Sequence, residues 1–190
     1  MTDVIVGIDV GKKGAIAVLI SGTAPSVLPF PWHQENGADA AGLAWILQGT
    51  VGLGSVAVYA ETQAPFAGAG RSIGASSAMT IGRTVGVLEG IVAALSRLGA
   101  SITLEWVEPR VWQAILPAST LEAPKRGSMS QSEKAAWVEK RRADAKARSM
   151  AFAAEWSGHS LRFPRSRVQQ DGIADALNIA RWGHLKKDQK

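Results

Sequence analysis

Apolar residues in the first part of the chain occur in short runs that end on turn residues or on acids. Val4–Asp9 is an apolar run that closes on a carboxylate, and Ala15–Ile20 follows it after the glycine-bounded turn Gly11–Gly14. Two short apolar runs joined by such a turn predict a β-hairpin. A third strand is expected near Val27–Phe30, where prolines mark the end of the pattern.

The middle of the chain alternates helical and strand patterns. Ala38–Gln48 has apolar residues on one side of a helix, and the β-branched run Ser55–Glu61 predicts a buried central strand that again ends on an acid. A long helix is expected over Ala78–Leu98 and another strand over Ile102–Val107. The glycine-, alanine- and serine-rich stretch Ala64–Ser77 lacks periodicity, so we expect a mobile loop there.

The last third of the chain is predominantly helical in pattern. A helix is expected to begin at Pro109, because proline prefers the first helical position. Residues 117–132 have the composition of a flexible insertion, and a basic helix is predicted from Ser132 to about Trp156. Gln169–Leu185 predicts a terminal amphipathic helix. The order of elements predicts one α/β domain with a mixed central sheet, antiparallel in its first three strands and then parallel, flanked by helices.

Composition agrees with one folded domain and restricts the kinds of metal site. The 190 residues are 46% hydrophobic and contain no cysteine, which excludes disulfides and thiolate zinc sites. The three histidines are scattered, so a bound metal would need oxygen ligands. No apolar run of about 18 residues is evident and the N-terminus has a strand pattern. We therefore expect a cytoplasmic protein that makes no membrane contact.

Charge is distributed unevenly along the chain. Residues 1–109 carry five basic and eight acidic side chains, a net of −3, whereas residues 110–190 carry sixteen basic and eight acidic, a net of +8. This asymmetry favours a polyanionic partner held mainly by the C-terminal half, although a solvated basic surface would have the same composition.

Four acids stand in apolar surroundings where solvated acids are unusual. Asp9 and Glu61 each end a predicted strand, and Asp171 and Asp175 lie four residues apart on one face of the terminal helix. Like charges at that spacing destabilise a helix unless a cation such as Mg²⁺ offsets them. Four acids could hold two such ions, the arrangement that many nucleases use for phosphodiester hydrolysis. Each strand-end acid could alternatively cap a turn, and Asp171 could be the N-cap of its helix.

Three segments that contain these acids resemble the acidic motifs of RuvC-type Holliday junction resolvases, particularly the phage-borne branch. The segments are GIDVGKKGAIAV (Gly7–Val18), VYAETQ (Val58–Gln63) and DGIADALNIARW (Asp171–Trp182). The resemblance implies a ribonuclease-H-like fold, which the element order also suits. It further implies a homodimer, Mg²⁺ or Mn²⁺ as cofactor, and paired nicks in a four-way junction during DNA recombination and repair.

Residue by residue, Asp9, Glu61, Asp171 and Asp175 match the family's metal ligands. Many cellular members space the last two acids by three residues rather than four, a departure that affects Asp171 most. The segment VEPRVWQAILP (Val107–Pro117) is similar to a proline-tryptophan motif of the phage members. The resemblance also suggests that Lys146, on a later helix, stabilises charge at the cleaved phosphate, although it could equally be one more solvated lysine.

DNA contacts are expected from basic and aromatic residues outside the acidic motifs. Phe66 follows Glu61 in the predicted loop, where it could enter the unstacked centre of a junction or anchor the loop on the core. The candidates for phosphate contacts are Arg71, Lys125, Arg126 and Arg142.

The long central helix carries small residues at a strict four-residue spacing, namely Ala78, Gly82, Gly86 and Gly90. Each glycine costs about 1 kcal/mol relative to alanine inside a helix, so this face needs a packing reason. Either the helix lies flat on its own sheet, or the face is the contact of a two-fold dimer. The family resemblance favours the dimer.

Other functions are compatible with parts of this sequence. The hairpin GIDVG also resembles the phosphate-binding hairpin of actin-like ATPases and sugar kinases, but those need a duplicated domain and a second glycine-rich loop. A non-catalytic DNA-binding module would not need four acids. A broader flap or fork debranching nuclease is the closest alternative. The seven tryptophans lie in apolar patterns and are assigned to the core.

Overall fold

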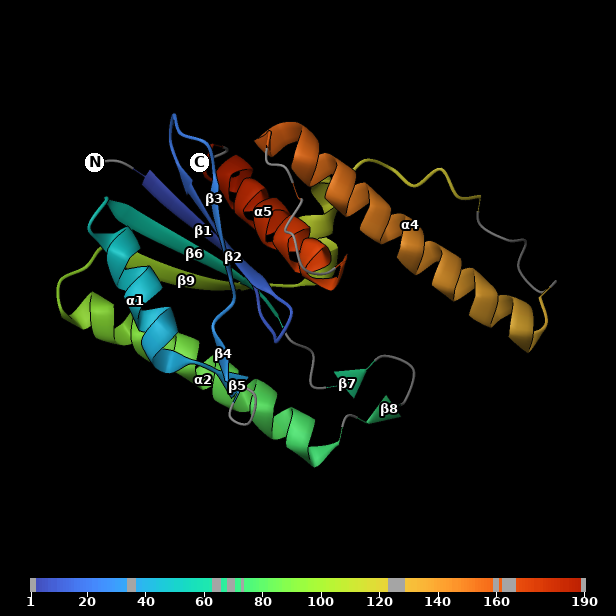
Figure 1. Cartoon of the computed structure of the whole chain (residues 1–190), viewed down its shortest axis with the longest axis horizontal. Coiled ribbons are helices and arrows are strands. Elements are labelled where there is room, and N and C mark those ends of the chain that lie inside the picture. The colour runs from blue at the N-terminus through green and yellow to red at the C-terminus, as the bar shows by residue number, and fades with distance from the viewer. Residues whose placement is uncertain are drawn as a thin grey trace.

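Five strands form the central sheet, in the order β3–β2–β1–β6–β9 (Figure 1). The computed structural model describes residues 3–33, 37–62, 66–67, 71–72, 74–122, 129–158, 161 and 167–188, with the backbone alone for 66–67, 71–72 and 167–169. The sheet strands are β1 (Asp3–Asp9), β2 (Ala15–Ile20), β3 (Ser26–Pro29), β6 (Ser55–Glu61) and β9 (Ile102–Val107). β2 runs antiparallel to β1 and β3, while β1, β6 and β9 are parallel. The predicted mixed sheet is confirmed.

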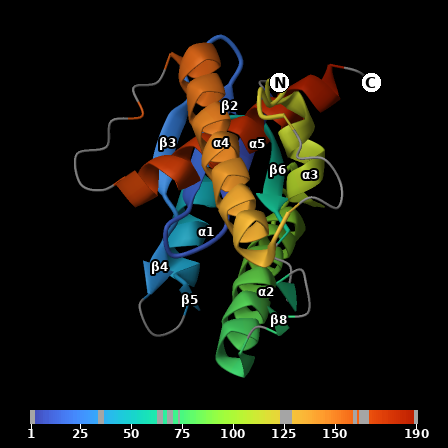
Figure 2. The same ribbon diagram turned by 90° about the vertical axis from the view of Figure 1, so that its right-hand side faces the viewer.

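Helices cover both faces of this sheet. One face carries α1 (Ala40–Val51) and α2 (Ala75–Arg97), and the other carries α5 (Arg167–Lys187), which α4 (Gln131–Ser157) crosses on its outer side (Figure 2). The short helix α3 (Pro109–Trp112) continues into a 3-10 turn, Gln113–Ile115. Two small ladders complete the described structure: β4 (Trp32–His33) with β5 (Gly37–Ala38), and β7 (Phe66–Ala67) with β8 (Arg71–Ser72).

Alternation along β1 sends its side chains to both layers of the core. Val4, Val6 and Ile8 pack with the residues of α1 and α2, whereas Ile5 packs with those of α5. On the α5 side Gly7 leaves room for the helix backbone, because a Cβ there would lie 2.3 Å from the carbonyl oxygen of Ala176. α5 therefore rests directly on the central strand.

Several predicted boundaries are wrong. α2 begins at Ala75, so the end of the expected loop 64–77 is helical, and the described part of that loop contains the β7–β8 ladder. α4 begins at Gln131, one residue before the predicted start, with Ser130 as its N-cap in a capping box with Glu133. The expected insertion 117–132 thus ends in the cap and first turn of a helix, and its residues 123–128 lie outside the described residues.

The alternative that Asp171 caps the terminal helix is also wrong, because α5 begins at Arg167. Asp171 has a full turn of helix before it. Its carboxylate therefore projects from the helix body rather than satisfying the first backbone N–H groups.

The assignment of all tryptophans to the core holds for only part of the set. Trp112 is 1% exposed, whereas Trp45 on α1 is 75% exposed. The others are half-buried: Trp32, Trp106, Trp137, Trp156 and Trp182. An aromatic residue inside an apolar helical pattern can thus still lie on the outer face.

α2 is more apolar and more exposed than the pattern suggested. Its most apolar 18-residue stretch has a mean hydropathy of 1.4 and is 17% buried. By length and composition alone this helix could cross a membrane, although Arg83 and Glu89 interrupt its apolar residues, so that it contains no unbroken apolar run of 18 residues. Core helices of water-soluble domains have the same composition, and Thr84, Leu88 and Val92 do bury one side of α2.

Candidate metal centre

The two strand acids end neighbouring parallel strands. β1 and β6 pair in register with Ile8 opposite Ala60, so Asp9 and Glu61 follow at the same edge of the sheet. Tyr59 and Ile5, two and four residues before these acids, pack with α5. Since side chains alternate along a strand, both carboxylates lie on the α5 face. The predicted convergence of the two strand acids is confirmed.

The two helix acids come to this edge because α5 lies very close to the β1–β2 hairpin. A Cβ on Gly172 would lie 2.3 Å from the carbonyl oxygen of Lys13 and 2.9 Å from Oδ2 of Asp9. Only a residue without a side chain fits between the helix and the hairpin. This contact places Asp171 and Asp175 beside Asp9, a residue more than 160 positions away in the sequence.

Burial and mutual repulsion raise the pKa values of three of these acids. Burial raises the pKa of Asp9 to about 8, with further contributions from the charges of Asp175, Glu61 and Asp171. Burial likewise raises the pKa of Glu61 to about 7, and the charge of Asp175 adds to the effect. The pKa of Asp175 rises to about 6 for the same reasons, with Asp171 as its acidic neighbour. The four acids therefore interact as one electrostatic group.

Three of the acids also have a defined hydrogen-bond partner. The buried indole Nε1 of Trp112 donates to Oε2 of Glu61 at 2.9 Å. The hydroxyl of Ser149 donates to Oδ1 of Asp175 at 2.6 Å. The ammonium of Lys146 forms an ion pair with Oδ2 of Asp171, which raises the pKa of the lysine. Both neutral donors lower the pKa of their acid, and so partly oppose the effect of burial.

A divalent cation would stabilise these four acids in their ionised form, which protonation cannot do. Carboxylate oxygens are the ligands that Mg²⁺ and Mn²⁺ prefer, and a cation would offset the repulsion that raises these pKa values. As they are placed, no three acids or histidines of the described residues lie close enough together to form a finished cage. Mg²⁺ commonly keeps several waters and takes only one or two carboxylates, so it does not require one.

Of the other predicted site residues, only some are described with their side chains, and one of these lies beside the acids. Lys146 is brought into the acidic group, whereas Arg142 lies on the exposed part of α4 and pairs with Glu139 at 2.6 Å. Phe66 and Arg71 lie in the β7–β8 ladder, where only their backbone is described. Lys125 and Arg126 lie outside the described residues.

The small residues of α2 do not face the sheet. Gly82, Gly86 and Gly90 are exposed, and a Cβ at any of them would meet no atom within 4 Å. Ala78 is half-buried. Since Leu88 and Val92 are the residues that pack on the core, flat packing of the glycine face on the sheet is wrong.

Sequence reasoning missed several residues that support the site. Ser149 and Asn178 were not singled out, and Trp112 was assigned to the core without its contact to Glu61. One signal was available for Asn178, because it is a polar residue between Leu177 and Ile179 in an apolar run and is fully buried. No comparable signal marks Ser149, since its partner lies on another helix.

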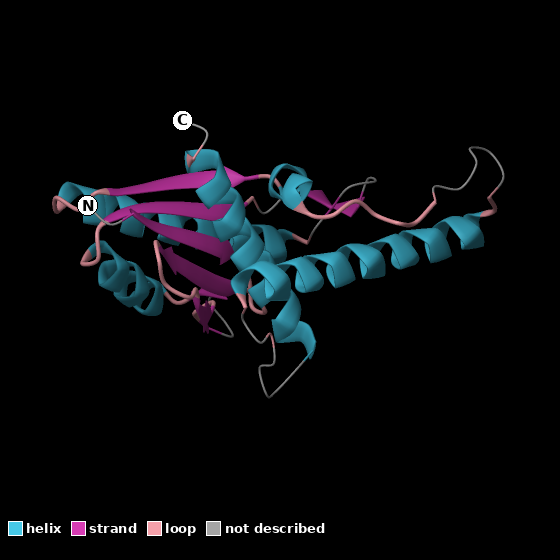
Figure 3. Ribbon diagram, turned by 90° about the horizontal axis from the view of Figure 1, so that it is seen from above, coloured by secondary structure: helices cyan, strands magenta, loops and turns pink. Residues whose placement is uncertain are grey.

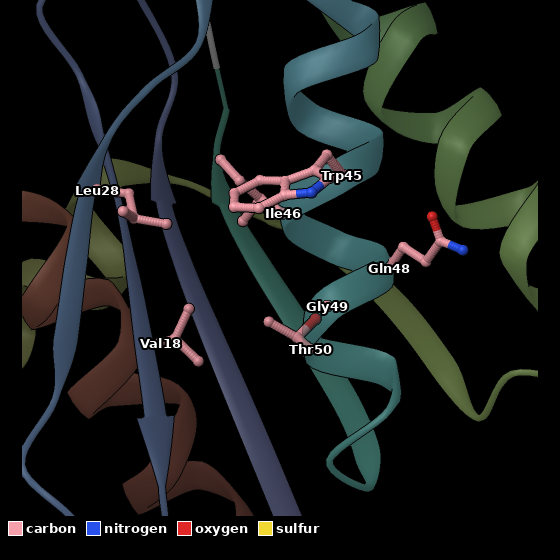
Figure 4. Close-up of a pocket in the computed structure, with 7 residues that line it drawn as sticks. All are labelled: Val18, Leu28, Trp45, Ile46, Gln48, Gly49 and Thr50. Carbon is pink, nitrogen blue, oxygen red and sulfur yellow. The ribbon is translucent and has the colours of Figure 1, made fainter.

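A separate apolar pocket of about 390 Å³ lies between α1 and strands β2 and β3 (Figure 4). Trp45 and Ile46 line it from the helix, and Val18 and Leu28 line it from the strands. None of the acids or other predicted site residues line this pocket.

Comparison with known proteins found similarity in structure alone. No protein-family model and no curated protein matches the chain. Among solved structures, RuvC of Thermus thermophilus in complex with a Holliday junction substrate matches with a TM-score of 0.49 and 14% identity, covering 98% of this chain and 95% of that one. A second Thermus thermophilus RuvC structure matches with a TM-score of 0.45 and 16% identity, over 96% of both chains.

The strand directions described above are those of the predicted mixed sheet. The chain has a mixed α/β fold with helices on both faces of a five-stranded sheet, and its structure is similar to these RuvC structures.

Proposed function

We propose that this protein is a divalent-metal-dependent endonuclease that cuts branched DNA, with four-way junctions as its preferred substrate. The observation that carries the proposal is the convergence of four acids at one edge of the sheet, namely Asp9, Glu61, Asp171 and Asp175. Burial and repulsion raise the pKa values of Asp9, Glu61 and Asp175 there. An electrostatic group of this kind is typical of sites that bind Mg²⁺ and a phosphodiester together.

In this proposal the four acids hold two Mg²⁺ ions, for which Mn²⁺ can substitute. Such ions supply charge stabilisation at the phosphoryl oxygens and acidify a water molecule for in-line attack. Asp9, the most strongly shifted acid, is central because it interacts with all three of the others. Glu61 and Asp175 each keep one carboxylate oxygen engaged by a neutral donor, which limits the orientations available to the other oxygen.

Lys146 is proposed to bind the cleaved phosphate. Its ammonium lies on Asp171 and its side chain is 62% exposed, so it is at the edge of the acidic group and accessible to DNA. An ammonium there can hold a non-bridging phosphate oxygen and stabilise the charge that develops during cleavage. The ion pair with Asp171 keeps the lysine at this place before DNA arrives.

The exposed half of α4 is proposed to hold a DNA arm. This helix extends well beyond the sheet (Figures 1 and 3), and its residues 131–143 are exposed apart from Trp137. Its basic residues are suited to phosphate contacts: Lys134, Lys140, Arg141 and Arg142. Four further DNA contacts are proposed from the sequence alone: Phe66, Arg71, Lys125 and Arg126.

Paired nicks require two active sites, and we propose a homodimer formed through α2. Gly82, Gly86 and Gly90 form an exposed face without neighbouring atoms, on a helix that is largely apolar. A two-fold axis near this face would place two acidic sites on opposing strands of a symmetric junction.

The experiment is to incubate synthetic four-way junction, replication fork and linear duplex with Mg²⁺ and either wild type or Asp175→Asn. Paired symmetric nicks in the junction are expected from wild type. The variant is expected to lose at least about 100-fold in rate while it still binds the junction, because one ligand of the reacting centre is neutralised. Glu155→Gln, which neutralises an exposed acid of α4, is the matched control and should cut as wild type does.

Undiminished cutting by Asp175→Asn would refute the metal site. Equal cutting of linear duplex would refute structure selectivity, and equal cutting of fork and junction would identify a broader debranching nuclease.

A further inference from the structure

Asp175 is held by a chain of hydrogen bonds that passes through α4 and back to α5. The indole Nε1 of Trp156 donates to Oδ1 of Asn178 at 3.2 Å. The amide Nδ2 of Asn178 donates to the hydroxyl of Ser149 at 2.9 Å and to the carbonyl oxygen of Ser149 at 3.0 Å. The hydroxyl of Ser149 then reaches Oδ1 of Asp175 at 2.6 Å.

The donors along this chain all point in one direction. An indole N–H can only donate, so it fixes the oxygen of the Asn178 amide on its own side and turns the amide nitrogen toward Ser149. The hydroxyl of Ser149 accepts from that nitrogen, and its single proton is therefore directed to Asp175. The orientation of the hydroxyl is thus set by two side chains, Asn178 and Trp156, that act on the acid only through Ser149.

The chain is buried at its centre. Asn178 is fully buried and Ser149 is 4% exposed, so water does not compete for these hydrogen bonds. Both protons of the Asn178 amide nitrogen are used, and both ends of the amide have partners. In a medium of low polarity such a satisfied network resists rotation of its members.

A neutral donor orients Asp175 without removing its charge. A lysine or arginine in the place of Ser149 would neutralise the carboxylate and compete with a metal ion for it. The hydroxyl donates to Oδ1 and leaves Oδ2 to other partners. One oxygen of the acid is thus anchored while the other remains available as a ligand.

We infer that Ser149 is a positioning residue for the metal centre: Asn178 and Trp156 fix the direction of its hydroxyl, which anchors Oδ1 of Asp175 and presents Oδ2 to a divalent cation. The inference rests on the proposed function, because it requires Asp175 to be a ligand. α4 therefore carries, on one rigid helix, both the basic residues proposed to hold DNA and the hydroxyl that anchors a ligand (Figure 2).

The test measures Mn²⁺ affinity of the full chain by calorimetry or by electron paramagnetic resonance, without DNA, alongside the melting temperature of each variant. Ser149→Ala is expected to weaken Mn²⁺ binding by about 10-fold to 100-fold, the usual effect of removing a partner that orients a metal ligand. Asn178→Leu has a similar side-chain volume and frees the Ser149 hydroxyl to rotate. We expect it to lose less Mn²⁺ affinity than Ser149→Ala does. Ser157→Ala removes another hydroxyl of the same helix, one that donates to the carbonyl oxygen of Ala153, and should retain wild-type affinity.

The double variant Ser149→Ala, Asn178→Leu separates positioning from general stability. Because Asn178 acts through Ser149, the double variant should bind Mn²⁺ no more weakly than Ser149→Ala alone. Additive losses in affinity, or a lower melting temperature with unchanged affinity in Ser149→Ala, would overturn the inference. If wild type shows no saturable Mn²⁺ binding, or binds as Asp175→Asn does, the proposed metal site itself fails.

Discussion

The pKa of Asp9 depends on its burial and on the acids around it. It ends a buried strand, and burial together with three neighbouring acids raises its pKa to about 8. Between the pKa of the unfolded chain, near 3.8, and this value, the folded protein binds the proton more tightly than the unfolded chain does. The protonated form of Asp9 therefore contributes to the free energy of unfolding at low pH. This contribution is lost as the pH rises from about 4 to about 8.

In the presence of a chelator, the melting temperature of wild type is accordingly expected to fall between about pH 5 and pH 8. Asp9→Asn removes the largest contribution, so its curve should be flatter and its melting temperature at pH 8 higher by a few degrees. Each kcal/mol corresponds to roughly 2–4 °C in a chain of this length. Thermal unfolding followed by circular dichroism checks both statements.

Glu155→Gln is the control for that experiment, since its exposed carboxylate should leave the pH dependence unchanged. Saturating Mg²⁺ should raise the melting temperature of wild type at pH 8 and have little effect on Asp9→Asn. A lower melting temperature for Asp9→Asn at pH 8 would contradict the view that its ionised form destabilises the fold.

The acids themselves were predictable from the sequence, and their hydrogen-bond partners were not. Asp9 and Glu61 end apolar strand patterns, which is visible in a single sequence, and the structure places both at one edge of the sheet. Ser149 and Trp112 reach their acids from elements 26 and 51 residues away. A serine in a basic helical stretch has no local feature that distinguishes it from a solvated one.

At the scale of elements, α5 determines the site because it lies directly on the β1–β2 hairpin. Gly7 and Gly172 both allow this approach, one from the strand and one from the helix. A helix that was lifted by a side chain at either position would carry Asp171 and Asp175 away from Asp9. The glycine beside Asp171 is thus part of the geometry of the site.

Gly172→Ala is expected to destabilise the protein by about 1–3 kcal/mol, the usual effect of overpacking. The new Cβ would lie 2.3 Å from a backbone oxygen, which cannot move aside as a flexible side chain could. Gly49→Ala, inside α1 and without atoms within 4 Å, is the matched control and should stabilise by up to about 1 kcal/mol. Urea denaturation measures both, and equal effects of the two substitutions would show that α5 does not rest on the hairpin in this way.

Element boundaries depended on how local their signals were. The predicted bounds of β6 and β9 agree with the structure, because β-branched apolar runs between turn residues are a strong local pattern. The start of α4 was predicted one residue late, although Ser130 and Glu133 form a readable capping box. The exposure of Trp45 could not be predicted, because it depends on which side of α1 meets the sheet.

At the scale of the whole molecule, the two halves of the chain differ in charge and in task. The acidic site is built from both halves, whereas the exposed basic helix α4 belongs to the C-terminal half and extends past the sheet (Figure 3). On the opposite face of the sheet, α2 exposes a largely apolar surface that includes the open face of Gly82, Gly86 and Gly90. We propose that a second copy of the chain covers that face.

Gly86→Leu tests this assignment because the substitution meets no atom within a single chain. A leucine there should be tolerated by the monomer, and it would keep two α2 helices from approaching closely at their glycine faces. We expect sedimentation velocity to show a dimer for wild type and a monomer for Gly86→Leu, with the melting temperature of the variant independent of concentration. Gly49→Leu places the same side chain in open space on α1 and should remain dimeric. A dimer that persists in Gly86→Leu would place the contact elsewhere, and paired nicking by such a dimer would show that the two sites are brought together by another face.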